Sequence, residues 1–159
     1  MFKKLLTTRS MCVSAVIAAL YAALTLLLAP ISYGNIQLRV SEAMTLLPIV
    51  LPQAIPGLFV GCLIANLYTG MLTDIIFGSM ATLVAAVGTY LLRRKPFLAA
   101  ACPVVANAVI VGLVLALTSN WPIALTMLQV GVGEVGAVLI GCVLLSAMKR
   151  ARIDFTRLG

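Results

Sequence analysis

The chain alternates long uncharged, mainly apolar runs with short charged segments. The uncharged runs cover residues 10–38, 43–73, 75–92, 96–133 and 135–148. A helix that crosses a bilayer needs roughly 17–25 mainly apolar residues. The run 96–133 is too long for one helix, and its segment Ser119-Asn120-Trp121-Pro122 is typical of a turn. We therefore expect helices near residues 10–30, 42–52, 54–70, 73–92, 97–118 and 122–148.

The basic residues decide between six helices and five. The second predicted helix is short for a span, and merging residues 42–70 into one helix would leave five. With six helices, ten of the eleven Lys and Arg residues fall on one side, and only Arg39 falls on the other. Lys and Arg in short flanks stay on the cytoplasmic side. The pattern therefore favours six transmembrane helices with both termini cytoplasmic.

Composition supports a membrane protein. Hydrophobic residues make up 63% of the 159 residues and charged residues 9%, against roughly 45–50% and about 25% in an ordinary soluble domain. The net charge of +7 lies mostly in the short flanks of the helices, which indicates membrane orientation and not nucleic-acid binding. We expect an all-α integral membrane protein in which residues 1–159 form a single transmembrane domain.

The residues needed for common enzyme chemistry are missing from the sequence. The chain has no histidine, which excludes Ser-His-Asp, Cys-His and HExxH sites. No P-loop motif is present, so we expect no ATP hydrolysis by that route. The four cysteines lie inside apolar runs and form no CxxC pair, so neither a zinc site nor any other metal or cofactor is expected. A membrane enzyme is therefore a weak alternative.

A few polar residues interrupt the apolar runs and suggest a binding pocket. At 1.5 Å per residue, Glu134 would lie about 18 Å below the outer end of the sixth helix, and Asn107 about 16 Å below that of the fifth. Gln129 would lie above Glu134, and Asn66 nearer the outer surface. We expect Glu134 to be the only deeply placed acid, with no basic residue at its depth. Such charges are usually functional, although a neutral, hydrogen-bonded structural carboxyl is an alternative.

Arg39 and Glu42 flank the outer end of the second predicted helix and would line the mouth of this pocket. Alternatively, they pair with each other and cap that helix, with Ser41 as its N-cap. Tyr33 would either cover a ligand ring or anchor the chain at the interface. The candidate substrate-binding residues are Glu134, Asn107, Gln129, Asn66, Arg39, Glu42, Tyr33 and Asn35.

Small residues recur at four-residue spacing on two predicted helices. Ala15, Ala19 and Ala23 follow one line on the first helix, and Gly57, Gly61 and Ala65 follow one on the third. Such stripes allow close approach between membrane helices. They serve either packing inside this chain or docking of a partner protein.

Three segments carry a resemblance to a known family. They are residues 29–43 (APISYGNIQLRVSEA), 52–67 (PQAIPGLFVGCLIANL) and 74–79 (DIIFGS). Together they resemble the queuosine-precursor transporter (QueT-type) family, the substrate-binding S components of energy-coupling-factor (ECF) transporters. The resemblance is most specific between about residues 15 and 92 and weaker after that, although length and helix count agree throughout.

The resemblance implies a six-helix subunit of a bacterial plasma membrane. Such subunits bind a vitamin-like solute with high affinity and dock on a transmembrane component driven by two ABC ATPases. The implied solute is a 7-deazaguanine such as preQ1, or queuine. Within the first alanine stripe, Ala15 and Ala19, or Ala19 and Ala23, resemble the AxxxA docking motif of these subunits. Two alternatives are an S component for another solute, such as thiamin or tryptophan, and a stand-alone ion-coupled carrier.

Overall fold

A computed structural model describes residues 7–32 and 39–151, and the secondary structure of these residues is entirely helical. The expected helices are confirmed to within a few residues. The elements are, in chain order, α2 (Thr8–Leu27), α3 (Ala29–Ser32), η1 (Val40–Ile49), α4 (Ala54–Thr69), η2 (Asp74–Gly78), α5 (Ser79–Leu91), α6 (Pro96–Ser119) and α7 (Ile123–Arg150). The π-helical η2 continues directly into α5, so the pair forms one segment.

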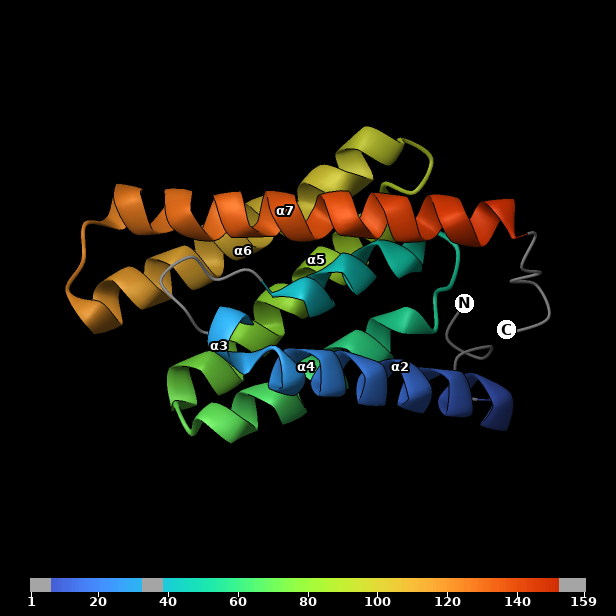
Figure 1. The fold of residues 1–159 in the computed structure, drawn as a ribbon, viewed down its shortest axis with the longest axis horizontal. Coiled ribbons are helices and arrows are strands. Elements are labelled where there is room, and N and C mark those ends of the chain that lie inside the picture. Colours follow the sequence, from blue (N-terminus) through green and yellow to red (C-terminus); the bar gives the residue numbers. More distant parts are fainter. Residues whose placement is uncertain (1–6, 33–38, 152–159) are drawn as a thin grey trace.

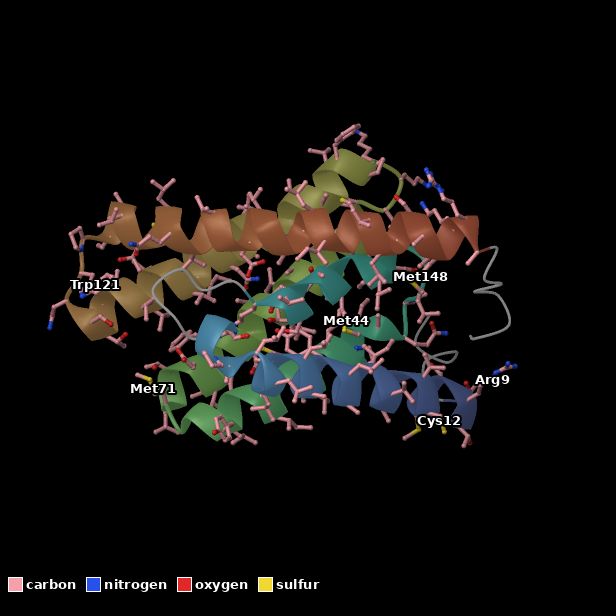
Figure 2. The ribbon with its side chains drawn as sticks, in the orientation of Figure 1. Arg9, Cys12, Met44, Met71, Trp121 and Met148 are labelled. Carbon is pink, nitrogen blue, oxygen red and sulfur yellow. The ribbon has the colours of Figure 1, made fainter. Side chains whose placement is uncertain are left out.

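Successive segments run in alternating directions along the bundle (Figure 1). A turn at residues 50–53 separates η1 from α4, which excludes the five-helix alternative. Figure 2 shows Arg9 and Met148 at one end, with Met71 and Trp121 at the opposite end. The start of α2 and the end of α7 therefore lie at the same end, as the distribution of basic residues predicts.

Only four of the helical segments are long and apolar enough to cross a membrane, among the residues that the structure describes. These spans are Thr8–Leu27, Asp74–Leu91, Pro96–Ser119 and Ile123–Arg150. Helices η1 and α4 have 10 and 16 residues. The expectation of six full transmembrane helices is therefore corrected to six helical segments, of which two are short.

The short helix η1 occupies the centre of the bundle and contacts α2, α4, α5, α6 and α7. Its residues from Ser41 to Pro48 are all buried. Gly141 of α7 lies against the backbone of Ala43, leaving no room for a side chain. A helix surrounded by others on all sides does not need to span the bilayer, since protein covers its ends and its polar groups.

The glycine stripe of α4 packs inside the chain. A Cβ added at Gly61 would lie 2.7 Å from the Ala18 carbonyl oxygen and 2.8 Å from the Tyr21 Cβ. At Gly57 it would lie 2.6 Å from the Ser14 carbonyl oxygen. Because only glycine fits such spacing, α2 and α4 approach closely. For this stripe, internal packing is therefore the correct alternative.

The expected turn between the last two helices is also confirmed. Asn120 ends α6 with a positive φ of 54°, a left-handed conformation that asparagine tolerates better than most residues. The chain then reverses into α7, so that α6 and α7 pack along each other. This hairpin brings Asn107 and Glu134 to neighbouring positions facing η1.

Candidate functional site

A cluster of buried polar side chains surrounds η1. Its charged members are Arg39, Glu42 and Glu134, which are 5%, 1% and 4% exposed. Asn66 of α4 and Asn107 of α6 are buried as well. Buried charge is costly unless it is paired or used, so this cluster is the strongest candidate for a functional site among the described residues.

Glu42 is held through one of its two carboxylate oxygens. The Tyr21 hydroxyl of α2 donates a hydrogen bond to Glu42 Oε1, and the Thr82 hydroxyl of α5 donates to the same oxygen at 3.0 Å. Glu42 Oε2 has no hydrogen-bond partner within the part of the chain that the structure describes. One oxygen of this buried carboxyl therefore remains available for a donor from a bound molecule.

Glu134 lies beside Glu42 and interacts electrostatically with both Glu42 and Arg39. The Asn107 amide is adjacent to the Glu134 carboxyl, yet its Nδ2 meets the criteria for a hydrogen bond with none of the described residues. Glu134 Oε2 also lacks a partner in residues 7–32 and 39–151. The matching depth expected for Asn107 and Glu134 is therefore confirmed.

These positions correct three expectations from the sequence. Glu42 does not lie at the outer mouth but in the core, so Glu134 is not the only deep acid. Arg39 is buried and close enough to act on Glu134, so a basic residue does share its surroundings. Ser41 does not cap η1, because it lies inside the helix and its hydroxyl accepts a hydrogen bond from Thr25 at 2.6 Å.

Asn66 connects α4 to the start of η2. Its Nδ2 donates to the Asp74 carbonyl oxygen at 2.9 Å and to Cys62 Sγ at 3.4 Å. A Cβ added at Gly78 would lie 2.8 Å from Asn66 Nδ2 and 3.9 Å from an Arg39 guanidinium nitrogen. The π-helical η2, of a type that is frequent at functional sites, thus brings Asn66 and Arg39 to one place.

Three further predicted residues are not shown to belong to the cluster. Gln129 is half-buried on α7, five residues before Glu134, which places it about 140° around the helix from Glu134. Tyr33 and Asn35 fall outside the described residues. A role for any of these three in binding stays a prediction.

Sequence reasoning missed Tyr21 and Thr82, the two donors that hold Glu42. Both side chains are completely buried. Tyr21 lies in the middle of the first uncharged run, too deep for a tyrosine that anchors a helix at the membrane interface. That depth is a signal that could have identified it. Thr82 gives no such signal, because a threonine in a membrane helix commonly bonds its own backbone.

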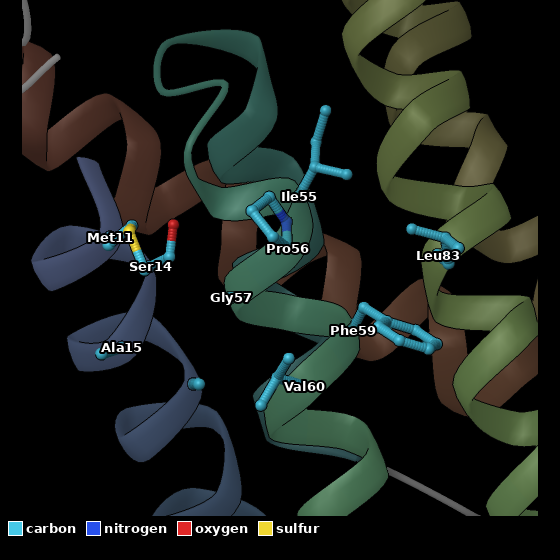
Figure 3. A pocket seen from close by; sticks show the side chains of 10 residues that line it. Met11, Ser14, Ala15, Ile55, Pro56, Gly57, Phe59, Val60 and Leu83 are labelled. Atoms are coloured by element: carbon cyan, nitrogen blue, oxygen red, sulfur yellow. The ribbon is translucent and has the colours of Figure 1, made fainter. Parts of the chain in front are cut away.

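The alanine stripe of α2 lies on the opposite side of the helix from Tyr21. Ala15, Ala19 and Ala23 are exposed, whereas Ala18 and Ala22 are buried. Figure 3 shows Ala15 at the edge of an apolar groove of about 560 Å³ between α2 and α4. The groove contains none of the buried polar residues that surround η1. The stripe is therefore free for contact with lipid or another protein.

The cluster has the chemistry of a binding site. It offers carboxylate oxygens that accept hydrogen bonds, amides that donate and accept them, and one guanidinium. Two acids and one base also leave an excess of one negative charge when both acids are ionised. The described residues contain no group of His, Cys, Asp or Glu arranged to hold a metal ion. This arrangement suits recognition of a small polar molecule with several N–H groups.

Comparison with known proteins shows the family of this chain. The family model described as "QueT transporter" matches residues 11–150. The queuosine precursor transporter QueT of Lactococcus lactis subsp. cremoris (strain MG1363) is 30% identical, over 90% of this chain and 93% of that protein. No solved structure matches the chain significantly. The match to the family model covers every described helix apart from the first residues of α2. The family is one of transporters, not of enzymes. The chain therefore belongs to the QueT transporter family.

Proposed function

We propose that this protein binds a queuosine precursor, a 7-deazaguanine such as preQ1 or queuine, for uptake into a bacterial cell. The observation that carries this proposal is the pair of buried carboxylates, Glu42 and Glu134, each with one oxygen that lacks a donor in the described residues. The name of the relative from Lactococcus lactis supplies the class of solute.

The solute has groups that complement this pair. The guanine-like edge of a 7-deazaguanine presents adjacent N–H donors, which a carboxylate accepts together. The aminomethyl group of preQ1 carries a positive charge and suits a second acid. Hydrogen bonds between charged partners are roughly twice as strong as those between neutral groups. We propose that Asn107 and Asn66 form hydrogen bonds with the remaining polar edge.

We also propose that the protein acts as the S component of an ECF transporter, with a transmembrane component and two ABC ATPases as partners. The exposed line of Ala15, Ala19 and Ala23 supports this proposal, because small side chains permit close approach of a partner helix. The four candidate membrane spans show no ATP-binding motif of their own.

The basic end of the bundle would face the cytoplasm. Arg9, Lys149 and Arg150 lie at the ends of α2 and α7, and Arg93 and Arg94 lie between α5 and α6. Cysteine substitution at Arg94 and labelling with a membrane-impermeant reagent tests the orientation. We expect no labelling in intact bacterial cells and labelling after permeabilisation. Labelling from outside would contradict cytoplasmic termini.

Calorimetry on the purified subunit tests the binding proposal. We expect preQ1 to bind the unmodified protein, and Glu134→Gln to weaken binding. Removing one partner of a buried charged hydrogen bond costs about 2–5 kcal/mol, or roughly 30-fold or more in affinity. Asp74→Asn is the matched control, because Asp74 is a half-buried acid outside the cluster. Equal affinity of folded Glu134→Gln and the parent would assign Glu134 a structural role.

Uptake assays separate the S component from a stand-alone carrier. In liposomes that contain this protein alone, we expect no accumulation of preQ1, and we expect ATP-dependent accumulation once the energising module is added. Uptake by the protein alone, driven by an ion gradient, would contradict the ECF assignment. Binding of thiamin or tryptophan in place of a deazaguanine would contradict the proposed solute.

A further inference from the structure

We propose that the two buried acids have different tasks: Glu42 binds the cationic amine of the solute through Oε2, and Glu134 binds the paired N–H groups of the guanine-like edge. Tyr21 and Thr82 are the positioning residues that impose this difference on Glu42. This inference rests on the proposed binding function, and it adds a specificity mechanism to that function.

The two carboxylates differ in the hydrogen bonds that they can still accept. A carboxylate has two oxygens with about four lone-pair sites in total. Tyr21 and Thr82 both donate to Oε1 of Glu42, which fills the sites of that oxygen. Glu42 therefore retains only Oε2, a single point of contact. A compact ammonium group needs one such point, whereas a pair of parallel N–H groups needs two oxygens.

The Glu134 carboxyl has different surroundings from the Glu42 carboxyl. No hydroxyl group donates to its carboxyl in the residues that are described, and its nearest polar neighbour is the Asn107 amide. Glu134 Oε2 has no partner among the described residues, and no hydroxyl group holds the other oxygen as Tyr21 and Thr82 hold Glu42 Oε1, so a two-point contact competes only with the Asn107 amide. Asn107 Nδ2 has no hydrogen-bond partner among the described residues, so it is available to donate to an acceptor on the same edge of the solute.

The local charge at Glu42 also differs between a solute with a cationic amine and one with a methyl group in its place. Glu42 is buried, and a buried carboxylate needs a compensating charge or hydrogen-bond donor. A cationic amine supplies both at Oε2, where no donor of the described residues reaches, whereas a methyl group supplies neither.

Glu42 lies on η1, whereas its donor Tyr21 lies on α2. Its hydroxyl is the donor from α2 to the Glu42 carboxyl. The Tyr21 ring packs in the apolar core with Leu58 and Ala54 of α4. This packing fixes the hydroxyl, which in turn fixes the direction in which Oε2 points. Loss of the hydroxyl should leave the core intact while releasing the carboxyl.

Two ligands and two acid variants test the division of tasks. The ligands are preQ1 and 7-methyl-7-deazaguanine, which has the same ring system but no amine. Calorimetry should show that Glu42→Gln weakens preQ1 binding by about 30-fold or more and changes binding of the methyl compound by less than about threefold. Glu134→Gln should weaken binding of both ligands similarly. The reverse pattern would overturn the assignment.

The positioning role is tested by Tyr21→Phe, which keeps the ring and removes the hydroxyl. We expect about tenfold weaker binding of preQ1, given the strength of a hydrogen bond to a charged group, and little change for the methyl compound. In a Glu42→Gln background the same substitution should have no further effect, because Tyr21 acts only through Glu42. An additive loss would instead place Tyr21 in direct contact with the solute.

Controls keep the outcomes distinct. Tyr68→Phe removes a hydroxyl from an exposed tyrosine and should not change binding of either ligand. If Tyr21→Phe does not fold, Thr82→Val removes the second donor to the same oxygen and should show the same selective loss. If neither Glu42→Gln nor Glu134→Gln weakens either ligand, the proposed function fails. If both weaken binding without discriminating the ligands, only the division of tasks fails.

Discussion

The two faces of α2 have similar composition but different surroundings. The buried face contains Ile17, Ala18 and Tyr21, and it packs against Gly57 and Gly61 of α4. On the exposed face lie alanines at the same four-residue spacing, separated by larger apolar side chains such as Val16 and Leu20. One face therefore completes the bundle and contributes a donor to the site, while the other meets lipid or a partner.

The difference shows that small-residue spacing does not identify the partner of a membrane helix. Lipid tails are as apolar as leucine, so a membrane helix has no polar face that marks its outside. What distinguishes the faces here is complementarity: Gly61 of α4 fits against Ala18 and Tyr21, whereas Ala19 is exposed among the described residues. Substitutions on the two faces should therefore have opposite consequences.

The largest loss of stability is expected for Ala18→Leu. Ala18 is 5% exposed, and its backbone lies where a Cβ at Gly61 would collide. A leucine would force α2 away from α4, at a cost of about 1–3 kcal/mol or more. It would also displace Tyr21 from Glu42. Thermal unfolding of the purified protein in detergent should show a clearly lower midpoint, together with weaker preQ1 binding. An unchanged midpoint would contradict the close α2–α4 contact.

A smaller loss is expected for Gly61→Ala, which adds a single methyl group at the same contact. The new Cβ would lie 2.7 Å from the Ala18 carbonyl oxygen, so the backbone must shift, and we expect a loss of about 1 kcal/mol or more. Gly131→Ala is the matched control on α7, since its nearest neighbour, the Ala108 Cβ, would be 3.5 Å away. That variant should be neutral or slightly more stable, because alanine is the better helix former. Equal unfolding midpoints for the two variants would contradict the close contact between Gly61 and Ala18.

Almost no loss of stability is expected for Ala19→Leu, the neighbour of Ala18 on the exposed face. The leucine would point away from the bundle, so the unfolding midpoint and the affinity for preQ1 should match those of the parent. Transport with the energising module should nevertheless be abolished, because a bulky side chain prevents close approach of a partner helix. Normal assembly and transport by Ala19→Leu would indicate that this face meets lipid only.

The smallest effects on the isolated subunit are expected for Ala15→Leu and Ala23→Leu, compared as a pair. Neither should change folding or binding, because both side chains are exposed. Their effects on transport should differ, and the variant with the stronger defect identifies which alanine pairs with Ala19 in docking. Co-purification with the transmembrane component provides the readout. Identical behaviour of the two variants would argue against a docking motif of two alanines.

Much of the fold could be predicted from the sequence. The helix boundaries, the turn at Asn120 and the placement of both described chain ends at one end of the bundle all follow from charge-free runs and flanking basic residues. These features are local, because a segment within lipid must satisfy its own backbone hydrogen bonds and keep its charges at the ends. The depth match of Asn107 and Glu134 follows from helix rise alone.

The candidate site could be predicted only in part. Glu134, Asn107 and Asn66 stand out because a polar residue in an apolar run is rare. Arg39 and Glu42 were identified but misplaced, because the sequence shows them beside the start of a helix and therefore suggests the membrane surface. Tyr21 and Thr82 were missed, since nothing near them in the sequence indicates a carboxylate partner on another helix.

The sequence by itself determined a membrane protein of six helical segments, with the basic residues gathered at one end. Only the tertiary structure decided that the short helix η1 lies in the centre of the bundle, in contact with α2, α4, α5, α6 and α7. That placement buries Glu42 beside Glu134 and gives it donors from α2 and α5. The physical reason is that the depth of a short helix depends on the helices packed around it, and not on its distance along the chain from a charged flank.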